Sequence, residues 1–223
     1  MCARYTVFTE DEIIEMRAII QKISEKFGYE PSGMGEVYPT NTAPILLLEK
    51  DILTPILASF GFRKTNSKTL NINARTDTII NALDNPQKHS MWREPILTRR
   101  CVVPSTGFYE WTRGLEQEPQ ISLFPIESSS KKNNPQVKLL FHRPKEEMLY
   151  IAGMVSSYMD KDGSVKDAFV ILTTAANPDM APYHDRMPVI LESDECVSWI
   201  KSDKFMRSVL IREGLKLQCK IAG

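Results

Sequence analysis

The sequence predicts an α+β fold, because its expected strands and helices do not alternate in the regular order of a parallel α/β sheet. Strand-like runs bounded by Pro, Gly and charged residues dominate the chain, and helical periodicity is confined to a few segments. The 223 residues fit one large or two small domains at about 100–200 residues each. We expect a single domain over residues 1–223, with the Ser/Lys/Asn-rich stretch at 114–136 as a mobile insertion on a long hairpin.

The composition is that of a globular protein, with 42% apolar and 25% charged residues. No apolar run approaches the roughly 18 residues that a membrane helix needs. Because 28 basic residues balance 28 acidic ones, the net field attracts neither nucleic acid nor an anionic membrane, and a polyanion site has to be a local patch. Four widely spaced cysteines without a signal peptide favour a cytoplasmic location.

The first expected elements are a short strand at 3–8 and a helix that follows it. Thr9 and Glu12 form a capping box, and Gly28 stands at the expected C-terminal cap. One helical face collects Ile13, Met16, Ile20, Ile23 and Phe27. Further strands are expected at 45–48, 52–62, 71–75, 96–104, 107–113, 138–143, 149–156 and 166–174, and further helices at 76–83 and within 193–211.

Cys2 is the most unusual residue for chemistry. If Met1 is removed, Cys2 carries an α-amine and a thiol on adjacent carbons. The amine, with a pKa of about 7.7–8.0, is partly unprotonated near neutral pH. It can condense with an aldehyde to a Schiff base, and the neighbouring thiol can close a five-membered thiazolidine. The alternative is that Met1 stays and Cys2 is a small buried residue.

Two further positions could exchange protons. In a strand over 107–113, Phe108 and Glu110 point one way and Tyr109 and Trp111 the other, which places a carboxylate beside aromatic surface. A salt-bridged glutamate is the alternative. His184 lies in a loop bracketed by prolines, a common place for functional side chains, although a lone histidine is also often structural. Scattered Cys and His residues predict no metal site, and we expect no cofactor.

Candidate contacts for an anion come from several arginines. Asn73 and Arg75 share one face of the strand at 71–75, and Arg4 shares the parity of Cys2. A guanidinium offers a fork suited to two phosphate oxygens. A local basic patch could be formed by Arg63, Lys64, Arg93, Arg99 and Arg100.

Read together, four blocks of sequence resemble the SOS-response-associated peptidases, the SRAP family. The blocks follow the family order and cover residues 1–5, 73–75, 99–111 and 184–191. The resemblance implies a single domain with a mixed, partly barrel-like sheet. It also implies a sensor of abasic sites in single-stranded DNA, which captures the ring-opened sugar on the amino-terminal cysteine as a thiazolidine cross-link, with a proposed autopeptidase activity. The expected partner is abasic single-stranded DNA, engaged by a monomer at the nucleoid.

The resemblance also implies roles for single residues. Cys2 would be the nucleophile, Glu110 the proton donor and acceptor, and His184 an aid to proton transfer that also slows reversal. Asn73 would hold the sugar or the amine. The expected DNA contacts are Arg4, Arg75, Arg93 and Pro39.

The chain departs from the family pattern in two places that bear on the site. Position 3 is Ala in place of the usual Gly, and Phe60-Gly61-Phe62 stands where a Trp-Gly pair is typical. Phenylalanine could still stack on exposed bases. Two other functions remain open: an amino-terminal-nucleophile hydrolase, in which the α-amine activates the thiol, and a module that binds single strands without covalent chemistry.

Overall fold

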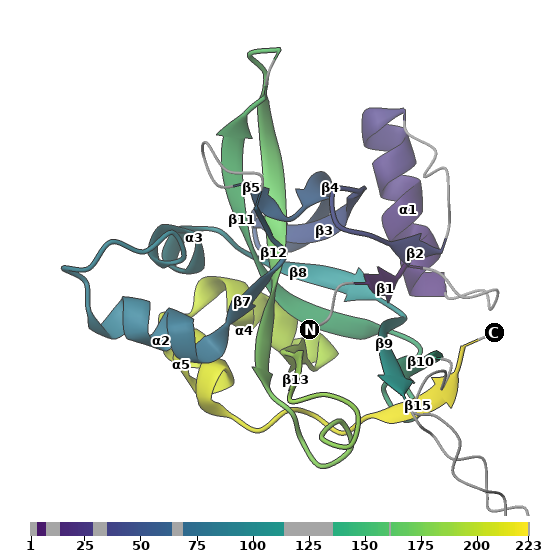
Figure 1. The fold of residues 1–223 in the computed structure, drawn as a ribbon. Helices are drawn as coiled ribbons and strands as arrows, with labels where there is room; N and C mark the ends of the chain where they lie inside the picture. Colours follow the sequence, from purple (N-terminus) through teal and green to yellow (C-terminus); the bar gives the residue numbers. More distant parts are fainter. Residues whose placement is uncertain are drawn as a thin grey trace, which may run out of the picture.

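The computed structural model describes residues 4–7, 14–28, 35–63, 69–113, 136–160 and 162–222. Cys2, the expected capping box at Thr9 and Glu12, and residues 114–135 of the expected insertion lie outside these ranges. The described elements confirm an α+β fold, in which strands form two larger sheets and helices cover the outside (Figure 1).

Five strands close into a barrel at the centre of the molecule. Each pairs with the next in the order β3, β4, β12, β11, β8, and β8 pairs with β3 to close the ring. The strands are β3 (Thr42–Glu49), β4 (Ile52–Phe60), β8 (Arg100–Ser105), β11 (Leu149–Met159) and β12 (Val165–Ala175). Three short strands add to this sheet: β7 (Asn73–Arg75), β13 (Arg186–Pro188) and β14 (Ile190–Leu191). The barrel-like part of the prediction is therefore confirmed.

A second sheet of five strands packs beside the barrel. Its order is β15 (Gln218–Ile221), β10 (Gln136–His142), β9 (Gly107–Arg113), β1 (Arg4–Thr6) and β2 (Glu36–Val37). The chain passes from β8 into β9 at Thr106, where the Ser105 hydroxyl donates to the carbonyl of Thr6 at 2.8 Å. Tyr5 joins the two sheets, because its ring lies 5.6 Å from that of Phe60 in the barrel wall. A two-stranded sheet is formed by β5 (Phe62–Arg63) and β6 (Leu70–Asn71).

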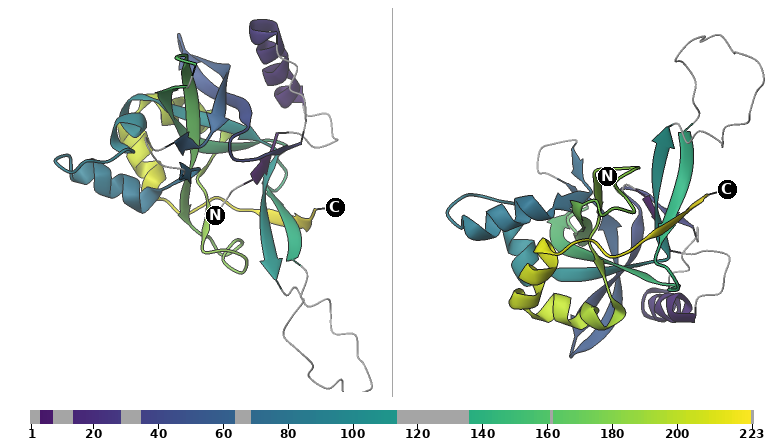
Figure 2. Two further views of the ribbon diagram at one scale, coloured as in Figure 1. Left: turned by 45° about the horizontal axis from the view of Figure 1, so that its top comes forward. Right: turned by 90° about the horizontal axis from the view of Figure 1, so that it is seen from below.

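The helices lie on the outer surface of the sheets. Helix α1 (Ile14–Phe27) lies on one side of the barrel, and α2 (Thr76–Asp84), α3 (Arg93–Thr98) and α5 (Asp203–Ile211) lie on the other (Figures 1 and 2). A 3₁₀ turn, η1 (Ser193–Glu195), leads into α4 (Cys196–Lys201). None of the helices in the described ranges is long and apolar enough to span a membrane.

Most of the expected elements are present, with local differences. Gly28 caps α1 as predicted, with a φ of +59° and an N–H that donates to Ser24. The buried face of α1 includes Ile19, which was not predicted. Phe27 is exposed, so the prediction that it belongs to the buried face is wrong. The helix at 76–83 and the helices within 193–211 are confirmed.

The strand predicted at 96–104 is wrong in its first half. Helix α3 occupies 93–98, and strand β8 begins only at Arg100. Pro95 is tolerated in α3 because the first-turn N–H groups of a helix have no intrahelical partner. A six-residue helix carries too little periodicity to be recognised in the sequence.

Candidate active site

Glu110 lies on the inner face of β9 and is 7% exposed. It alternates with Phe108 on that face, while Tyr109 and Trp111 point outward and are partly exposed, so the predicted alternation is confirmed. Across the pair with β10, Glu110 lies opposite Leu139 and Phe108 opposite Phe141, so apolar residues neighbour the carboxylate on this face. A carboxylate in such surroundings is a reasonable candidate for proton exchange.

The outer face of the same sheet holds Arg4 between two aromatic rings. Its guanidinium lies 4.6 Å from the ring centroids of both Tyr38 and Trp111, and Nη1 is 3.8 Å from Glu36 Oε2. Lys138 also pairs with Glu36. Although partial burial raises the pKa of Glu36, its hydrogen bonds with Lys138 and Tyr38 lower it more. This aromatic and cationic cluster was missed from the sequence, since Tyr38 follows β2 and Lys138 lies on β10, both far from Arg4 in the chain.

Asn73 and Arg75 lie on β7, which runs parallel to β12. The Asn73 side-chain amide donates to the carbonyl of Ile72 at 3.0 Å. Arg75 has a half-exposed side chain, and its Nε and Nη2 donate to the two carboxylate oxygens of Asp77 at 3.2 and 2.8 Å. These hydrogen bonds lower the pKa of Asp77 and raise that of Arg75. The opposite edge of the guanidinium points away from this pair of hydrogen bonds and can receive a phosphate.

His184 lies in the loop between β12 and β13, and its side chain is 26% exposed. The backbone N–H of Arg186 donates to Nδ1 at 2.9 Å. Asp185 Oδ1 lies 2.8 Å from the same nitrogen, although neighbours in sequence rarely pair in this way. One ring nitrogen cannot accept from an N–H and donate to a carboxylate at once. The ring that accepts from Arg186 at Nδ1 therefore carries its proton on Nε2.

Arg186 and Thr173 are site residues that the sequence reasoning missed. The Arg186 side chain is only 10% exposed, donates from Nη2 to the carbonyl of Thr173 at 2.6 Å and lies 4.0 Å from Asp77. Burial lowers the pKa of this guanidinium. Among the described residues, neither Arg186 Nε nor Thr173 Oγ1 has a hydrogen-bond partner, and both are buried. Thr173 lies opposite Arg75 in the β7–β12 pair, so the two arginines gather at one end of β12.

Aromatic contacts connect the sheet of Glu110 with the loop of His184. The Phe108 and Phe141 rings stack with centroids 5.3 Å apart, and Tyr183 packs edge-on against Phe141 at the same distance. Tyr183 directly precedes His184, and Phe108 is two residues from Glu110 on the same face. The loop after barrel strand β12 is thereby packed against the sheet that carries Glu110.

The two other predicted DNA contacts, Pro39 and Arg93, lie in a turn and at the start of a helix. Pro39 follows Tyr38 in the turn after β2, beside the cluster around Arg4. Arg93 donates to the carbonyls of Ala82 and Leu83 at the end of α2, at 3.0 and 3.3 Å. The structure therefore gives Arg93 a helix-capping contact. Cys2 lies outside the described residues.

The basic patch suggested by the sequence does not form around Arg100. This side chain is buried and donates to the carbonyls of Ile96, Trp199 and Ile200 at the ends of two helices. Lys64 lies outside the described ranges. The expectation for Arg100 is wrong because the sequence does not reveal which arginines cap buried carbonyl groups.

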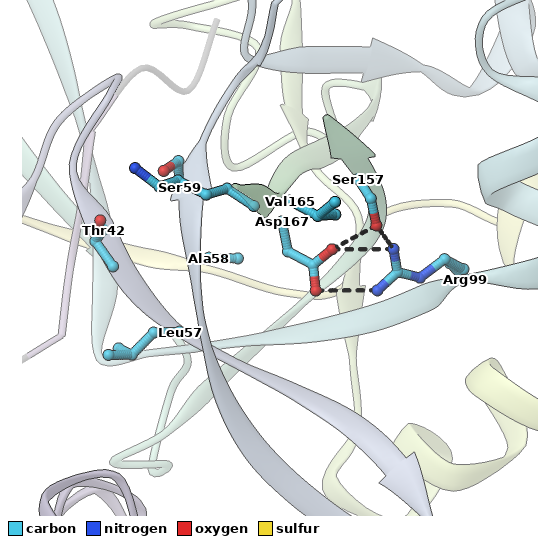
Figure 3. A pocket seen from close by; sticks show the side chains of 9 residues that line it. Thr42, Leu57, Ala58, Ser59, Arg99, Ser157, Val165 and Asp167 are labelled. Carbon is cyan, nitrogen blue, oxygen red and sulfur yellow. Dashed lines mark hydrogen bonds and ion pairs between the residues drawn. The ribbon is translucent and has the colours of Figure 1, made fainter. Parts of the chain in front are cut away.

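Arg99 belongs to a separate hollow of about 550 Å³ at one end of the barrel (Figure 3). Its guanidinium makes two hydrogen bonds to the Asp167 carboxylate, at 3.0 and 3.1 Å, and a third to Ser157. The three polar side chains bind one another, as the dashed lines in Figure 3 show. Their arrangement joins the ends of β8, β11 and β12.

The expectation of base stacking on Phe60 and Phe62 is also wrong. Phe60 is fully buried and Phe62 is 4% exposed. Phe62 stacks on Trp92 with ring centroids 5.9 Å apart, and Phe60 stacks on Phe169 at 5.1 Å. Both rings therefore serve the core, whereas the rings of Tyr38 and Trp111 are at least partly exposed and hold Arg4 between them.

The fold and these residues define an α+β barrel protein whose candidate site combines a buried acid, an imidazole and a pair of arginines. Residues 1–216 match the model of the SRAP family, described as SOS response associated peptidase. The chain belongs to this family.

Several known proteins resemble the chain over most of its length. Abasic site processing protein YoqW of Bacillus subtilis is 29% identical over 214 residues, which is 90% of this chain and 80% of that protein. Abasic site processing protein HMCES of Rattus norvegicus is 30% identical over 80% of this chain, which spans 55% of HMCES. A crystal structure of a Bacteroides thetaiotaomicron protein has a TM-score of 0.68 at 22% identity, covering 99% of this chain and 91% of that one. At that identity it supports the fold alone.

Proposed function

We propose that this protein senses abasic sites in single-stranded DNA and captures them covalently through Cys2 after removal of Met1. Relatives named abasic site processing proteins support the choice of substrate. The site supports the chemistry, because the buried carboxylate of Glu110 lies on β9, which pairs with β1, and β1 begins two residues after Cys2. The imidazole of His184 directly follows Tyr183, whose ring packs against Phe141 of the same sheet. Arg75 and Arg186, at the end of β12 near the loop of His184, are suited to phosphates that flank a lesion.

The proposed reaction joins the ring-opened deoxyribose aldehyde to the α-amine. The amine nitrogen attacks the aldehyde carbon, and loss of one water molecule gives an imine. The Cys2 thiol then adds across the C=N bond: sulfur bonds to carbon, and the thiol proton is transferred to nitrogen. The product is a thiazolidine, and no oxidant or reductant is needed. Its closure is fast because both nucleophiles belong to one residue.

The observation that carries the proposal is the pairing of β1 with β9. Arg4 lies opposite Tyr109, the residue next to Glu110. Covalent geometry limits the distance between the Cα atoms of Cys2 and Arg4 to about 7 Å. We infer that this short connection brings the amine of Cys2 to the strand that carries the buried carboxylate.

In this proposal each site residue has a defined role. Glu110 transfers protons during sugar ring opening and imine formation, and His184 assists and slows reversal. Asn73 holds the sugar or the amine. Arg4, Arg75 and Arg186 contact phosphates, and Pro39 and Arg93 lie along the path of the DNA.

The decisive experiment uses protein whose mass proves that Met1 is absent. Incubated with single-stranded DNA containing one abasic site, it should give a shifted band on a denaturing gel. Cys2→Ala should give no stable band. Cys2→Ser keeps the amine but lacks the thiol, so its band should appear only after borohydride reduction of the imine. A stable band of wild-type intensity with Cys2→Ala would contradict the proposal.

The amino-terminal-nucleophile hydrolase, the alternative function that the sequence leaves open, uses the same residue differently. The Cys2 thiol would attack an amide while the α-amine serves as its base. Turnover of a peptide substrate by the processed protein, lost in Cys2→Ala and unaffected by abasic DNA, would favour that function over covalent capture.

A further inference from the structure

Glu110 and His184 belong to different parts of the fold, so their relative position depends on the contacts that join those parts. Glu110 is carried by the five-stranded sheet, whereas His184 follows barrel strand β12. The aromatic contact between Phe141 and Tyr183 provides one connection. The C-terminal segment, residues 214–221, provides a second one through hydrogen bonds.

Asn177 binds the His184 loop to the C-terminal segment. Asn177 is only 4% exposed. The side-chain Nδ2 donates to the carbonyl of Leu215 at 2.8 Å and to that of Gly214 at 3.3 Å. Its Oδ1 accepts from the backbone N–H of Met180 at 3.0 Å. Met180 in turn accepts from the N–H of His184 at 3.1 Å, so the amide of Asn177 reaches His184 through one residue.

Asp179 makes a second link between the same two segments. Its Oδ2 accepts from the backbone N–H of Leu217 at 2.9 Å. Two residues further along, the Cys219 thiol donates to the hydroxyl of Tyr183 at 3.5 Å. The loop is therefore held to the C-terminal segment on both sides of Met180.

The C-terminal segment is itself part of the sheet that carries Glu110. Strand β15 pairs with β10, where Cys219 lies opposite Phe141 and Ile221 opposite Leu139. Leu139 is the partner of Glu110 in β9. Strand β15 lies beyond residues 1–216, which match the family model.

We propose that Asn177 and Asp179 are positioning residues for the reaction: by fixing the His184 loop to the C-terminal segment, they set the place of the imidazole relative to the Glu110 carboxylate. This inference rests on the proposed function. A loop held by fewer bonds would let the imidazole move, and a displacement of about 1 Å can cost up to about 100-fold in rate.

The first test is a double-mutant cycle on the rate of cross-linking. Asp179→Ala removes the acceptor for Leu217 and should slow single-turnover cross-linking by roughly 3- to 10-fold. Asp179→Asn retains an oxygen acceptor and should restore most of the rate. In a His184→Ala background, Asp179→Ala should cause less than about a twofold further loss, because the residue acts through His184. A loss of the same size in both backgrounds would indicate a merely structural role and overturn the inference.

The second test observes His184 without any DNA. The chain has three histidines, so the ring signals can be assigned by nuclear magnetic resonance with His184→Ala. Asp179→Ala and Asn177→Ala should shift or broaden the His184 signals and leave those of the exposed His89 unchanged. Asp179→Asn should resemble the wild type. Unchanged His184 signals in both alanine variants would refute the inference even if cross-linking were slower.

The two tests separate this inference from the proposed function. If the wild type forms no cross-link but the His184 signals respond to Asp179→Ala, the proposed function fails and the positioning role stands. If the wild type forms the cross-link and neither readout responds to the alanine variants, the proposed function stands and the positioning role fails.

Discussion

At the scale of single residues, the burial of Glu110 matters most. The carboxylate lies on the inner face of β9, among Phe108, Leu139 and Phe141, and only 7% of the residue is exposed. Burial of this kind separates a group that can exchange protons with a bound sugar from the many carboxylates on the surface.

We therefore predict that Glu110→Gln slows cross-linking by about 10²- to 10⁴-fold, because the amide keeps the shape but cannot transfer a proton. Binding of lesion-free single-stranded DNA should be nearly unchanged. Single-turnover gels and fluorescence anisotropy measure the two quantities. Glu49→Gln, at the exposed end of β3, is the matched control and should react as the wild type does. A Glu110→Gln variant of full activity would remove Glu110 from the mechanism.

A second feature at this scale is the Arg99–Asp167 pair at the barrel end. Burial raises the pKa of Asp167, but the hydrogen bonds from Arg99 and Ser157 lower it more. A depressed folded-state pKa means that the stabilisation is present above the unfolded pKa of about 3.9 and is lost as the pH falls through the folded value.

Asp167→Asn should therefore lower the free energy of unfolding by about 1–2 kcal/mol at neutral pH. The difference from the wild type should shrink as the pH falls below about 4, because the wild-type carboxylate is then protonated too. Urea unfolding between pH 3 and 7 measures this. Asp51→Asn, in an exposed pair with Lys201, should change stability little. A difference for Asp167→Asn that is constant with pH would argue against the ion pair.

At the scale of elements, the close contact between β9 and β10 holds the site residues in place. Gly107 begins β9, and a Cβ atom there would lie 2.6 Å from the carbonyl oxygen of Phe141 and 2.7 Å from Leu140 Cδ1. Backbone oxygen cannot move aside cheaply, so the approach of the two strands requires glycine at this position.

Gly107→Ala should destabilise the protein by about 1–3 kcal/mol and also slow cross-linking, because β9 and Glu110 are displaced together. Gly28→Ala is a control of similar stability cost, about 1–2 kcal/mol, since it places a Cβ on a residue with φ of +59° and no neighbour within 4 Å. It should leave the cross-linking rate unchanged. Thermal unfolding and single-turnover rates measure both. Equal cross-linking rates for the two variants would show that the position of β9 does not affect the reaction.

At the scale of the whole molecule, the balance of 28 basic and 28 acidic residues limits electrostatic attraction for DNA. Binding then depends on local cations, and the candidates are Arg4, Arg75 and Arg186. All three lie near a carboxylate, Arg4 near Glu36 and both Arg75 and Arg186 near Asp77, which further reduces the local field.

For lesion-free single-stranded DNA we therefore predict a shallow salt dependence. With about three phosphate contacts, the slope of log K against log salt should be about −2. Arg75→Ala should reduce its magnitude by about 0.7, whereas Arg207→Ala, on helix α5 and paired with Asp84, should not change it. Anisotropy titrations at several KCl concentrations measure the slope. A slope steeper than about −5 would require a larger cationic surface than the one identified.

The sequence by itself determined the features that depend on neighbouring residues. The alternation of Phe108 and Glu110 with Tyr109 and Trp111, the C-terminal cap at Gly28 and the helix predicted at 76–83 are local, because side-chain direction and helix termination are set within a few residues. The ordered sequence blocks were sufficient to indicate the family.

Only the tertiary structure decided which distant residues meet. Closure of the barrel, the burial of Arg100 under helix ends, and the meeting of Arg186 with Thr173 and Asp77 depend on strand pairings far apart in sequence. The contact between Phe141 and Tyr183, which brings the His184 loop to the sheet of Glu110, is of the same kind. Such pairings are fixed by register and packing over the whole chain, and no short sequence pattern records them.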